Sequence, residues 1–228
     1  MKKLICYSLW GDNPRYTEGA IRNAELAKVV YPDWICRFYV GNCVPIDIMN
    51  RLTSFDNVEI VEMGVVGDWT GMFWRFTAAS DKDVSIMLSR DTDSRLTLRE
   101  KYSVDEWLNS KFSFHIMRDH PYHSTEILGG MWGVKGDILD GISNLITDYV
   151  KGDFWQVDQN FLREKIWPLV KENSFTHDEF FSHVFGPANP YKFKRDPKHF
   201  IGQAYDGDDK ILDDNVYFND YLDKSKKI

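Results

Sequence analysis

Short apolar runs and amphipathic stretches alternate along the first half of the chain. Runs rich in β-branched and aromatic residues predict strands, whereas apolar positions three or four residues apart predict helices. The expected strands are Leu4–Leu9, Ile35–Val40, Val58–Val61 and the run that begins at Val84, and the expected helices are Tyr16–Val30, Ile46–Leu52 and Thr70–Ala79. This alternation predicts an α/β fold with a doubly wound, mostly parallel sheet flanked by helices.

The second half of the chain continues the pattern less regularly. The expected elements are a helix at Leu98–Leu108, strands at Phe112–Met117 and Leu128–Val134, and helices at Ile138–Val150 and Val157–Val170. The last of these contains Pro168, which has no backbone N–H to donate and should disturb the helix. Beyond Asn173 the chain is rich in loop signals and aromatic residues. We therefore expect one domain over residues 1–205 and a C-terminal extension over residues 206–228.

Composition and charge narrow the possible partners. The chain has 228 residues, of which 43% are hydrophobic, enough for one large core. Its net charge of −7 argues against a general nucleic-acid partner, because such binding needs a clustered basic surface. No apolar stretch has the length of a membrane span, and Leu4–Trp10 is too short for a signal peptide. The three cysteines lack metal-pair spacing, so we expect reduced thiols and a cytoplasmic location.

Two carboxylates, Asp91 and Asp93, directly follow the apolar run from Val84. The carboxyl edge of an α/β sheet is where ligands bind, and the chain must turn there. Two hard oxygen ligands at such an edge suit Mg²⁺ or Mn²⁺, which complete their coordination with substrate phosphates and water. A solvated acidic turn is the structural alternative.

Aromatic and basic residues near this edge are candidates for binding a nucleotide. Tyr7, Ser8 and Trp10 end the first strand and offer the aromatic face and polar groups that orient a base. Core packing is the alternative for the two aromatic residues. Arg75 and Arg95 lie on either side of the carboxylates in sequence, and each is expected to meet a phosphate or to pair with an acid.

Three further positions complete the candidate set. Gly129 and Gly130 fall within an expected strand, where glycines mark a close approach of backbone or ligand. Asp158 opens an expected helix and either caps it or projects into the site together with Gln159. His177 is a further Mn²⁺ ligand if its segment folds back over the sheet edge, and is structural otherwise.

Several motifs occur in an order that resembles a known family. They are Trp74-Arg75-Phe76, Ser89–Arg95, Arg99-Glu100, Trp107-Leu108, Met117–Pro121, Gly129–Gly133, Val157–Gln159 and Phe200–Gln203. Together they are similar to a small group of GT-A glycosyltransferases that includes compact domains encoded by large DNA viruses. The resemblance runs from about Lys3 to Asp206. It implies a Rossmann-like GT-A fold, a location in the host cytoplasm if the chain is viral, and a hexosyltransferase-type enzyme.

The resemblance also implies a donor and a metal site. The donor would be a nucleotide sugar, expected to be a UDP-sugar, and the acceptor a glycan or a small hydroxyl compound. Asp91 and Asp93 match the family's Asp-x-Asp motif, which holds Mn²⁺ or Mg²⁺ against the donor's diphosphate, with His177 a weaker match to a third ligand. The residues implied in binding the uridine, the ribose and the phosphates are Tyr7, Ser8, Trp10, Arg75 and Arg95.

The remaining implied roles concern the transferred sugar. Gly129 and Gly130 would let the sugar approach the backbone, and Asp158-Gln159 is similar to a pair that faces the sugar in some retaining enzymes. An inverting enzyme needs a carboxylate base instead, and Asp119 and Asp158 are both candidates. The Asp158-Gln159 pair favours retention.

Two other classes of function remain open from the sequence. A phosphatase-like hydrolase would use Asp91 as nucleophile and Asp93 as acid, since it also places Asp-x-Asp after a strand. Against it, Arg95 stands where that chemistry usually has a small β-branched residue. A non-catalytic carbohydrate-binding module would account for the aromatic residues but would not need a metal–diphosphate site.

Overall fold

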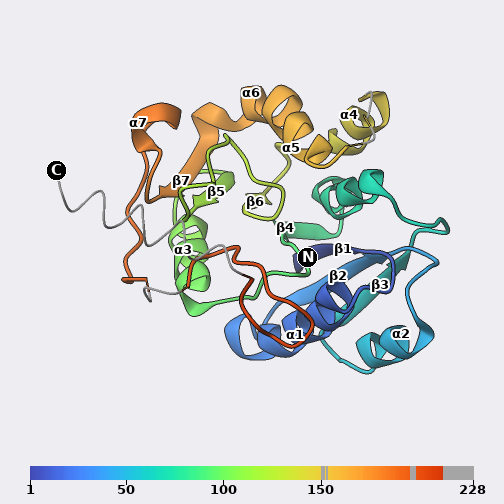
Figure 1. Ribbon diagram of the computed structural model, residues 1–228. Helices are drawn as coiled ribbons and strands as arrows, with labels where there is room; N and C mark the ends of the chain where they lie inside the picture. The colour runs from blue at the N-terminus through green and yellow to red at the C-terminus, as the bar shows by residue number, and fades with distance from the viewer. Residues whose placement is uncertain (150–151, 153, 196–198, 213–228) are drawn as a thin grey trace.

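The structure is a computed structural model that describes residues 1–149, 152, 154–195 and 199–212. Its centre is a seven-stranded sheet in the order β3-β2-β1-β4-β6-β5-β7 (Figure 1). The strands are β1 (Lys2–Leu9), β2 (Ile35–Val40), β3 (Val58–Glu62), β4 (Val84–Ser89), β5 (Phe114–Arg118), β6 (Trp132–Lys135) and β7 (Ser174–Asp178). Paired strands are parallel except that β6 runs antiparallel to both β4 and β5. The expected mostly parallel sheet is confirmed.

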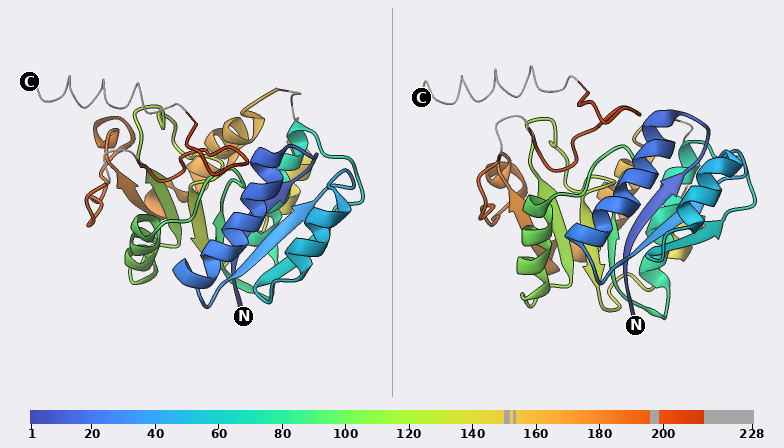
Figure 2. Two further views of the ribbon diagram at one scale, coloured as in Figure 1. Left: turned by 60° about the horizontal axis from the view of Figure 1, so that its bottom comes forward. Right: turned by 90° about the horizontal axis from the view of Figure 1, so that it is seen from below.

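Helices cover both faces of the sheet (Figures 1 and 2). One face carries α1 (Pro14–Val30), α2 (Ile46–Thr53) and α3 (Leu98–Leu108), and the other carries the 3₁₀ helix η1 (Trp69–Ser80), α4 (Ile142–Asp148), α5 (Val157–Phe161) and α6 (Trp167–Val170). Alternate residues of β1 belong to the two cores: Ile5 packs under α1, whereas Leu4 and Cys6 pack under η1. Burial on both faces explains why successive residues of β1, such as Leu4, Ile5 and Cys6, are apolar rather than every second one.

Helix α1 begins at the end of β1, and its start is fixed by local chemistry. The side chain of Asn13 accepts a hydrogen bond of 3.0 Å from the backbone N–H of Arg15, and Pro14 occupies the first turn. Both features favour helix initiation, because the first backbone N–H groups of a helix have no partner within it. The start of α1 therefore lies at the carboxyl edge of the sheet, two residues earlier than the sequence pattern indicates.

The expected elements of the second half need correction at several points. The strand expected at Leu128–Val134 is only Trp132–Lys135, because a backbone hydrogen bond from Met131 to Leu128 closes a turn before it. Residues 157–170 are helical but broken at the expected proline, with a π turn, η2 (Leu162–Ile166), before α6. Helix α4 is shorter than the expected 138–150, whose last residue lies outside the described residues.

The region beyond Asn173 contains elements that the sequence pattern does not reveal. After the short 3₁₀ helix η3 (Lys171–Asn173), β7 joins the sheet edge through parallel pairing with β5, and α7 (Ser182–Phe185) follows. The sequence of β7, Ser-Phe-Thr-His-Asp, has no apolar run to indicate a strand. None of the helices that the structure describes is long and apolar enough to cross a membrane.

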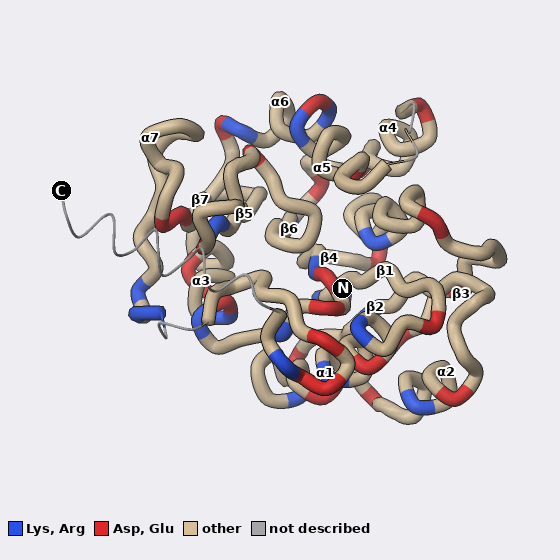
Figure 3. The backbone as a smooth tube through the Cα atoms, viewed as in Figure 1, with Lys and Arg blue, Asp and Glu red and all other residues tan. Residues whose placement is uncertain are grey.

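The described part of the expected C-terminal extension packs against the domain. This part, residues 206–212, lies beside the start of α1, at the opposite end of the sheet from the N-terminus (Figure 2). Asp209 forms ion pairs with Arg22 and Arg95, and Tyr205 forms an isolated β-bridge with Ile211. Residues 213–228 of the extension lie outside the described residues. Acidic and basic positions are interspersed along the visible chain (Figure 3).

Candidate active site

A cavity of about 490 Å³ opens at the carboxyl edge of β1 and β4. Its walls come from the loop after β1, the start of η1, the loop after β4, the turn before β6, the start of α5 and the C-terminal segment. Its volume is in the range of ligand sites in proteins, and its place matches the ligand-binding edge of open α/β sheets. Of the residues expected from the sequence, it contains Ser8, Trp10, Arg75, Asp91, Asp93, Gly129, Gly130, Asp158 and Gln159.

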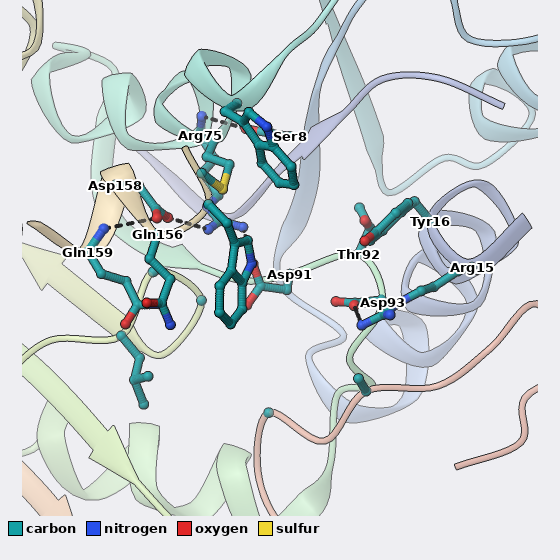
Figure 4. A pocket seen from close by; sticks show the side chains of 18 of the residues that line it. Ser8, Arg15, Tyr16, Arg75, Asp91, Thr92, Asp93, Gln156, Asp158 and Gln159 are labelled. Carbon is teal, nitrogen blue, oxygen red and sulfur yellow. Dashed lines mark hydrogen bonds and ion pairs between the residues drawn. The ribbon is translucent and has the colours of Figure 1, made fainter. Parts of the chain in front are cut away.

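Arg75 joins two of the carboxylates of the cavity (Figure 4). Its guanidinium donates to Asp91, to Oδ2 of Asp158 at 3.3 Å and to the backbone carbonyl of Arg90 at 3.0 Å. The side chains of Arg75 and Asp158 are only 6% and 4% exposed. Burial raises the pKa of Asp158, and the charge of Arg75 opposes that rise. Arg75 is therefore a fixed link that holds Asp91 against the start of α5.

The second carboxylate of the Asp-x-Asp motif, Asp93, forms an ion pair with a different arginine. Arg15, in the first turn of α1, approaches Oδ2 of Asp93 with Nε at 2.8 Å and Nη2 at 2.5 Å. Burial and the nearby charge of Asp91 raise the pKa of Asp93, although Arg15 counteracts them. The motif thus places two mutually repelling carboxylates in one cavity, each paired with a guanidinium.

Asn23 of α1 holds the loop that carries these carboxylates. Its buried side-chain amide donates to the carbonyls of Thr92 at 3.1 Å and Ser94 at 2.8 Å, and accepts from the N–H of Leu96 at 3.2 Å. Gly19 lies one turn earlier, and a Cβ there would overlap the carbonyl oxygen of Thr92. The close contact of α1 with this loop sets the position of Asp93.

The two glycines before β6 are required by the space around the carboxylates. A Cβ on Gly130 would overlap the carboxylate of Asp91, and a Cβ on Gly129 would meet Asp158 and, at 2.8 Å, Nη2 of Arg75. The backbone of this turn therefore lies directly against the acidic groups, as the glycines led us to expect, although it is a turn and not a strand.

Aromatic side chains form the rest of the wall. Ser8 accepts a hydrogen bond of 3.2 Å from the backbone N–H of Arg75, which ties the end of β1 to η1. Trp10 packs edge-on against Trp74 at a ring distance of 5.9 Å. Trp155, directly before α5, is 67% exposed although it lines the cavity. Aromatic side chains commonly line ligand-binding cavities.

The structure does not bring Tyr7 or Arg95 to the cavity. Tyr7 is fully buried and stacks on Phe38 at 4.8 Å, because successive residues of β1 face opposite sides of the sheet and Ser8 takes the side of the cavity. Arg95 pairs with Asp209 at 2.7 Å and with nearby backbone carbonyls, so its guanidinium secures the C-terminal segment. The expectations that these residues bind nucleotide are therefore corrected.

Asp119 and His177 also lie elsewhere. Asp119 is buried and pairs with Arg99 at 2.9 Å, so it does not line the cavity as a base would. His177 lies on β7, three strands from β4, and its ring nitrogens contact Nε2 of His115 at 2.9 Å and Oε2 of Glu106 at 3.1 Å. Its segment forms the sheet edge and does not fold over the carboxylates, so His177 is not a third metal ligand in this arrangement.

The cavity contains further residues, of which Arg15, Tyr16 and Gln156 were missed by the sequence analysis. Arg15 and Tyr16 enter through the early start of α1, and Gln156 enters through the loop before α5, with an unusual positive φ of 72°. His123 lines the cavity and accepts a hydrogen bond at Nδ1 from the N–H of Asp119. Burial lowers the pKa of His123 to about 3, so its ring is neutral. Because Nδ1 accepts a hydrogen bond, the single ring proton is on Nε2. Of these residues, only Arg15 and Tyr16 had a signal in the sequence: the Asn13-Pro14 pair, which is typical of a helix start.

The Asp91–Asp93 pair fits a divalent cation by its chemistry. Both groups are hard oxygen donors, and the raised pKa of Asp93 reflects burial and repulsion that a bound dication would relieve. Within the described ranges, no group of three or more His, Cys, Asp or Glu side chains is arranged to hold a metal. Further ligands would therefore come from substrate oxygens and water, the usual case for Mg²⁺ sites that bind phosphates.

Comparison with solved structures finds glycosyltransferases. A glycosyltransferase involved in the glycosylation of the major capsid of PBCV-1 matches with a TM-score of 0.52 and 15% identity, over 78% of this chain and 82% of that chain. The mannosyltransferase PcManGT of Pyrobaculum calidifontis, solved with GDP-Man and Mn²⁺, matches with a TM-score of 0.55 and 11% identity, over 82% of this chain and 56% of that chain. Staphylococcus aureus TarS 1-349 matches with a TM-score of 0.50 and 10% identity, over 77% of this chain and 58% of that chain.

These matches are similarities of structure and were not found from the sequence. No protein-family model matches the sequence, and no curated protein is detectably similar to it. The chain spans a little over half the length of the mannosyltransferase and of the TarS 1-349 segment. At identities this low the comparison establishes the fold and not the substrate. The chain has the GT-A fold of these glycosyltransferases, as its ordered motifs led us to expect.

Proposed function

We propose that this chain is a metal-dependent glycosyltransferase that moves a sugar from a nucleotide-sugar donor, expected to be a UDP-sugar, to a hydroxyl acceptor. The observation that carries the proposal is the convergence of Asp91, Asp93 and the Gly129–Gly130 turn in one cavity at the carboxyl edge of a GT-A sheet. A phosphatase-like hydrolase would need Asp91 as a free nucleophile, whereas Arg75 holds this carboxylate.

Each group in the cavity has a role in this proposal. Asp91 and Asp93 would hold Mn²⁺ or Mg²⁺, which supplies positive charge to the diphosphate as it leaves. Ser8 and Trp10 would face the nucleoside. The two terminal nitrogens of Arg75 already donate to Asp91, Asp158 and the carbonyl of Arg90, so we assign this side chain to positioning Asp91 and Asp158 rather than to contacting phosphate.

The transferred sugar would lie between the carboxylates and the start of α5. The Gly129–Gly130 turn lies directly against Asp91 and Asp158 and so closes this wall of the cavity, and Asp158 and Gln159 line the same side (Figure 4). We propose that Asp158 and Gln159 face this sugar, with retention as the expected outcome. Trp155 lies at the same end of the cavity, where the flat apolar face of a sugar acceptor could stack on its exposed ring.

Nucleotide binding should require metal. In a thermal-shift titration, UDP with Mn²⁺ at about a hundredfold excess over Kd should raise Tm by roughly 5–10 °C, whereas UDP with EDTA should have no effect. GDP and the corresponding nucleotide sugars, tested side by side, would identify the donor class. Failure of every nucleotide to bind in the presence of Mn²⁺ would refute the proposal, and sugar binding without nucleotide binding would indicate a carbohydrate-binding module.

The Gly130→Ala variant should lose nucleotide affinity without losing the fold. Its new Cβ overlaps the carboxylate of Asp91, which must move away from the position where it would hold the metal. We expect the Mn²⁺-dependent affinity for UDP to fall at least about tenfold, equivalent to about 1.4 kcal/mol. Gly141→Ala is the matched control, because a Cβ at Gly141 has no atom within 4 Å. Equal affinities in the two variants, measured by calorimetry, would contradict the assignment of Asp91.

A further inference from the structure

Among the residues that the structure describes, the wall of the cavity around the start of α5 has no positively charged side chain. This α5 wall comprises the lining residues of the cavity within 123–131, 155–159 and 202–204. Its titratable side chains are His123 and Asp158. Asp158 is an acid that already pairs with Arg75, and the ring of His123 is neutral, with its Nδ1 accepting a hydrogen bond from the backbone. The wall can therefore donate hydrogen bonds to a ligand, but it offers no positive charge.

The other side chains of the α5 wall suit the two kinds of surface on a sugar ring. Trp155 is 67% exposed and presents an aromatic face for the apolar side of the ring. Gln156 and Gln159 extend from the same turn of chain, where the backbone N–H of Gln159 donates to the carbonyl of Gln156 at 3.0 Å (Figure 4). A side-chain amide both donates and accepts hydrogen bonds, as a hydroxyl group does. The wall thus combines a stacking surface with uncharged hydrogen-bonding groups.

The charge of the whole cavity opposes an anionic acceptor. Its described lining contains four acids and two arginines: Asp12, Asp91, Asp93 and Asp158, and Arg15 and Arg75. Both arginines form ion pairs with these carboxylates. A bound dication would offset the charge of the donor's diphosphate, which leaves the acids in excess. A phosphate or carboxylate on the acceptor would lose its water beside negative charge, and no cation on the described part of the α5 wall would replace that water, which is costly.

We propose that the acceptor is an uncharged saccharide that stacks on Trp155 and donates and accepts hydrogen bonds at Gln156 and at Nε2–H of His123. This inference rests on the proposed function. If the nucleoside faces Ser8 and Trp10 and the transferred sugar lies beside α5, the acceptor must approach from the α5 wall, on the far side of that sugar. Sugars that carry a phosphate or a carboxylate are excluded as acceptors.

The transfer itself needs only a neutral hydroxyl group on this saccharide. The bond between the anomeric carbon and the phosphate oxygen breaks, and its electron pair stays on the nucleoside diphosphate. The acceptor oxygen forms the new bond to the anomeric carbon, and its proton passes to the released diphosphate. The charge of the acceptor is therefore set by recognition at the α5 wall and not by the chemistry of transfer.

The test compares sugars that differ only in charge. Calorimetric titrations would measure the binding of the methyl glycosides of glucose, galactose and mannose, of their 6-phosphates and of the corresponding uronic acids. The chain is first loaded with Mn²⁺ and UDP, or with the nucleotide that the thermal-shift titration identifies. At least one uncharged glycoside should bind, and its charged counterparts should bind at least about tenfold more weakly, because like charges placed together oppose binding.

Variants of the α5 wall test the residues that carry the inference. Trp155→Ala should weaken the binding of the uncharged glycoside roughly three- to tenfold, the range expected for a lost aromatic stacking contact. Phe193→Ala is the matched control, because Phe193 is also an exposed aromatic residue, at 47%, but lies outside the cavity. Gln156→Lys adds a cation to the wall and should raise the affinity for the 6-phosphate relative to its uncharged parent, whereas Gln156→Met, of similar length, should not.

The outcomes separate this inference from the proposed function. If the chain binds a nucleotide with Mn²⁺ but binds none of the uncharged glycosides, or binds a charged counterpart as tightly, the acceptor assignment is wrong and the proposed function stands. Equal affinities in Trp155→Ala and Phe193→Ala, or no gain for the 6-phosphate in Gln156→Lys, would also overturn recognition by the α5 wall. If no nucleotide binds with Mn²⁺, the proposed function fails and this inference fails with it.

Discussion

The Asp93→Asn variant is expected to fold normally and to lose metal-dependent nucleotide binding and sugar transfer. Asparagine keeps the size of the side chain but removes one of the two negative charges that would hold the cation. A catalytic metal contributes several kcal/mol of transition-state stabilisation, so its loss should reduce transfer on the order of a thousandfold. The thermal shift with UDP and Mn²⁺ should disappear, and the far-UV circular dichroism spectrum should be unchanged.

Asp137→Asn is the matched control for this variant. Asp137 is exposed and follows β6, which runs antiparallel to β4, so it lies at the opposite edge of the sheet from the cavity. Both substitutions remove one negative charge, and a general effect of net charge would therefore appear in both. Retention of the Mn²⁺-dependent UDP shift in Asp93→Asn would disprove that Asp93 is a metal ligand.

Strong local patterns accounted for much of the fold. The boundaries of β2 and α3 agree with their expected ranges, because β2 is rich in apolar and aromatic residues and α3 starts at the side-chain cap of Thr97. The position of Asp91 and Asp93 at the sheet edge follows from the apolar run of β4 alone. β7 lacks such a run because it is a short edge strand, stabilised by pairing with β5 that no local pattern encodes.

The candidate site was less predictable, because its arrangement depends on pairs distant in sequence. Arg95 and Asp209 are 114 residues apart, and nothing near Arg95 indicates that its guanidinium is engaged there. Tyr7 illustrates a different cause. Strand alternation requires Tyr7 and Ser8 to face opposite sides of the sheet, so only one of them could line the cavity, but the sequence does not say which.

Arg75→Met should be among the most destabilising single substitutions in this chain. Methionine fills the volume but leaves Asp158 buried without its cation, and breaking a buried ion pair in this way costs about 3–5 kcal/mol. Asp91 is 46% exposed and contributes less to this cost, because water can solvate it. Urea unfolding in the presence of EDTA would measure the loss of unfolding free energy without any contribution from bound ligand.

The double variant Arg75→Met/Asp158→Asn separates the buried charge from the packing of the arginine. If the uncompensated carboxylate of Asp158 causes most of the instability, neutralising it should restore a large part of the lost free energy, and the two substitutions should be strongly non-additive. Additive losses would instead assign the cost to the contacts of Arg75 with Asp91 and the carbonyl of Arg90. A loss below about 1 kcal/mol in Arg75→Met alone, the level of an exposed pair, would show that Arg75 is not the fixed link. Its guanidinium would then be able to meet a phosphate.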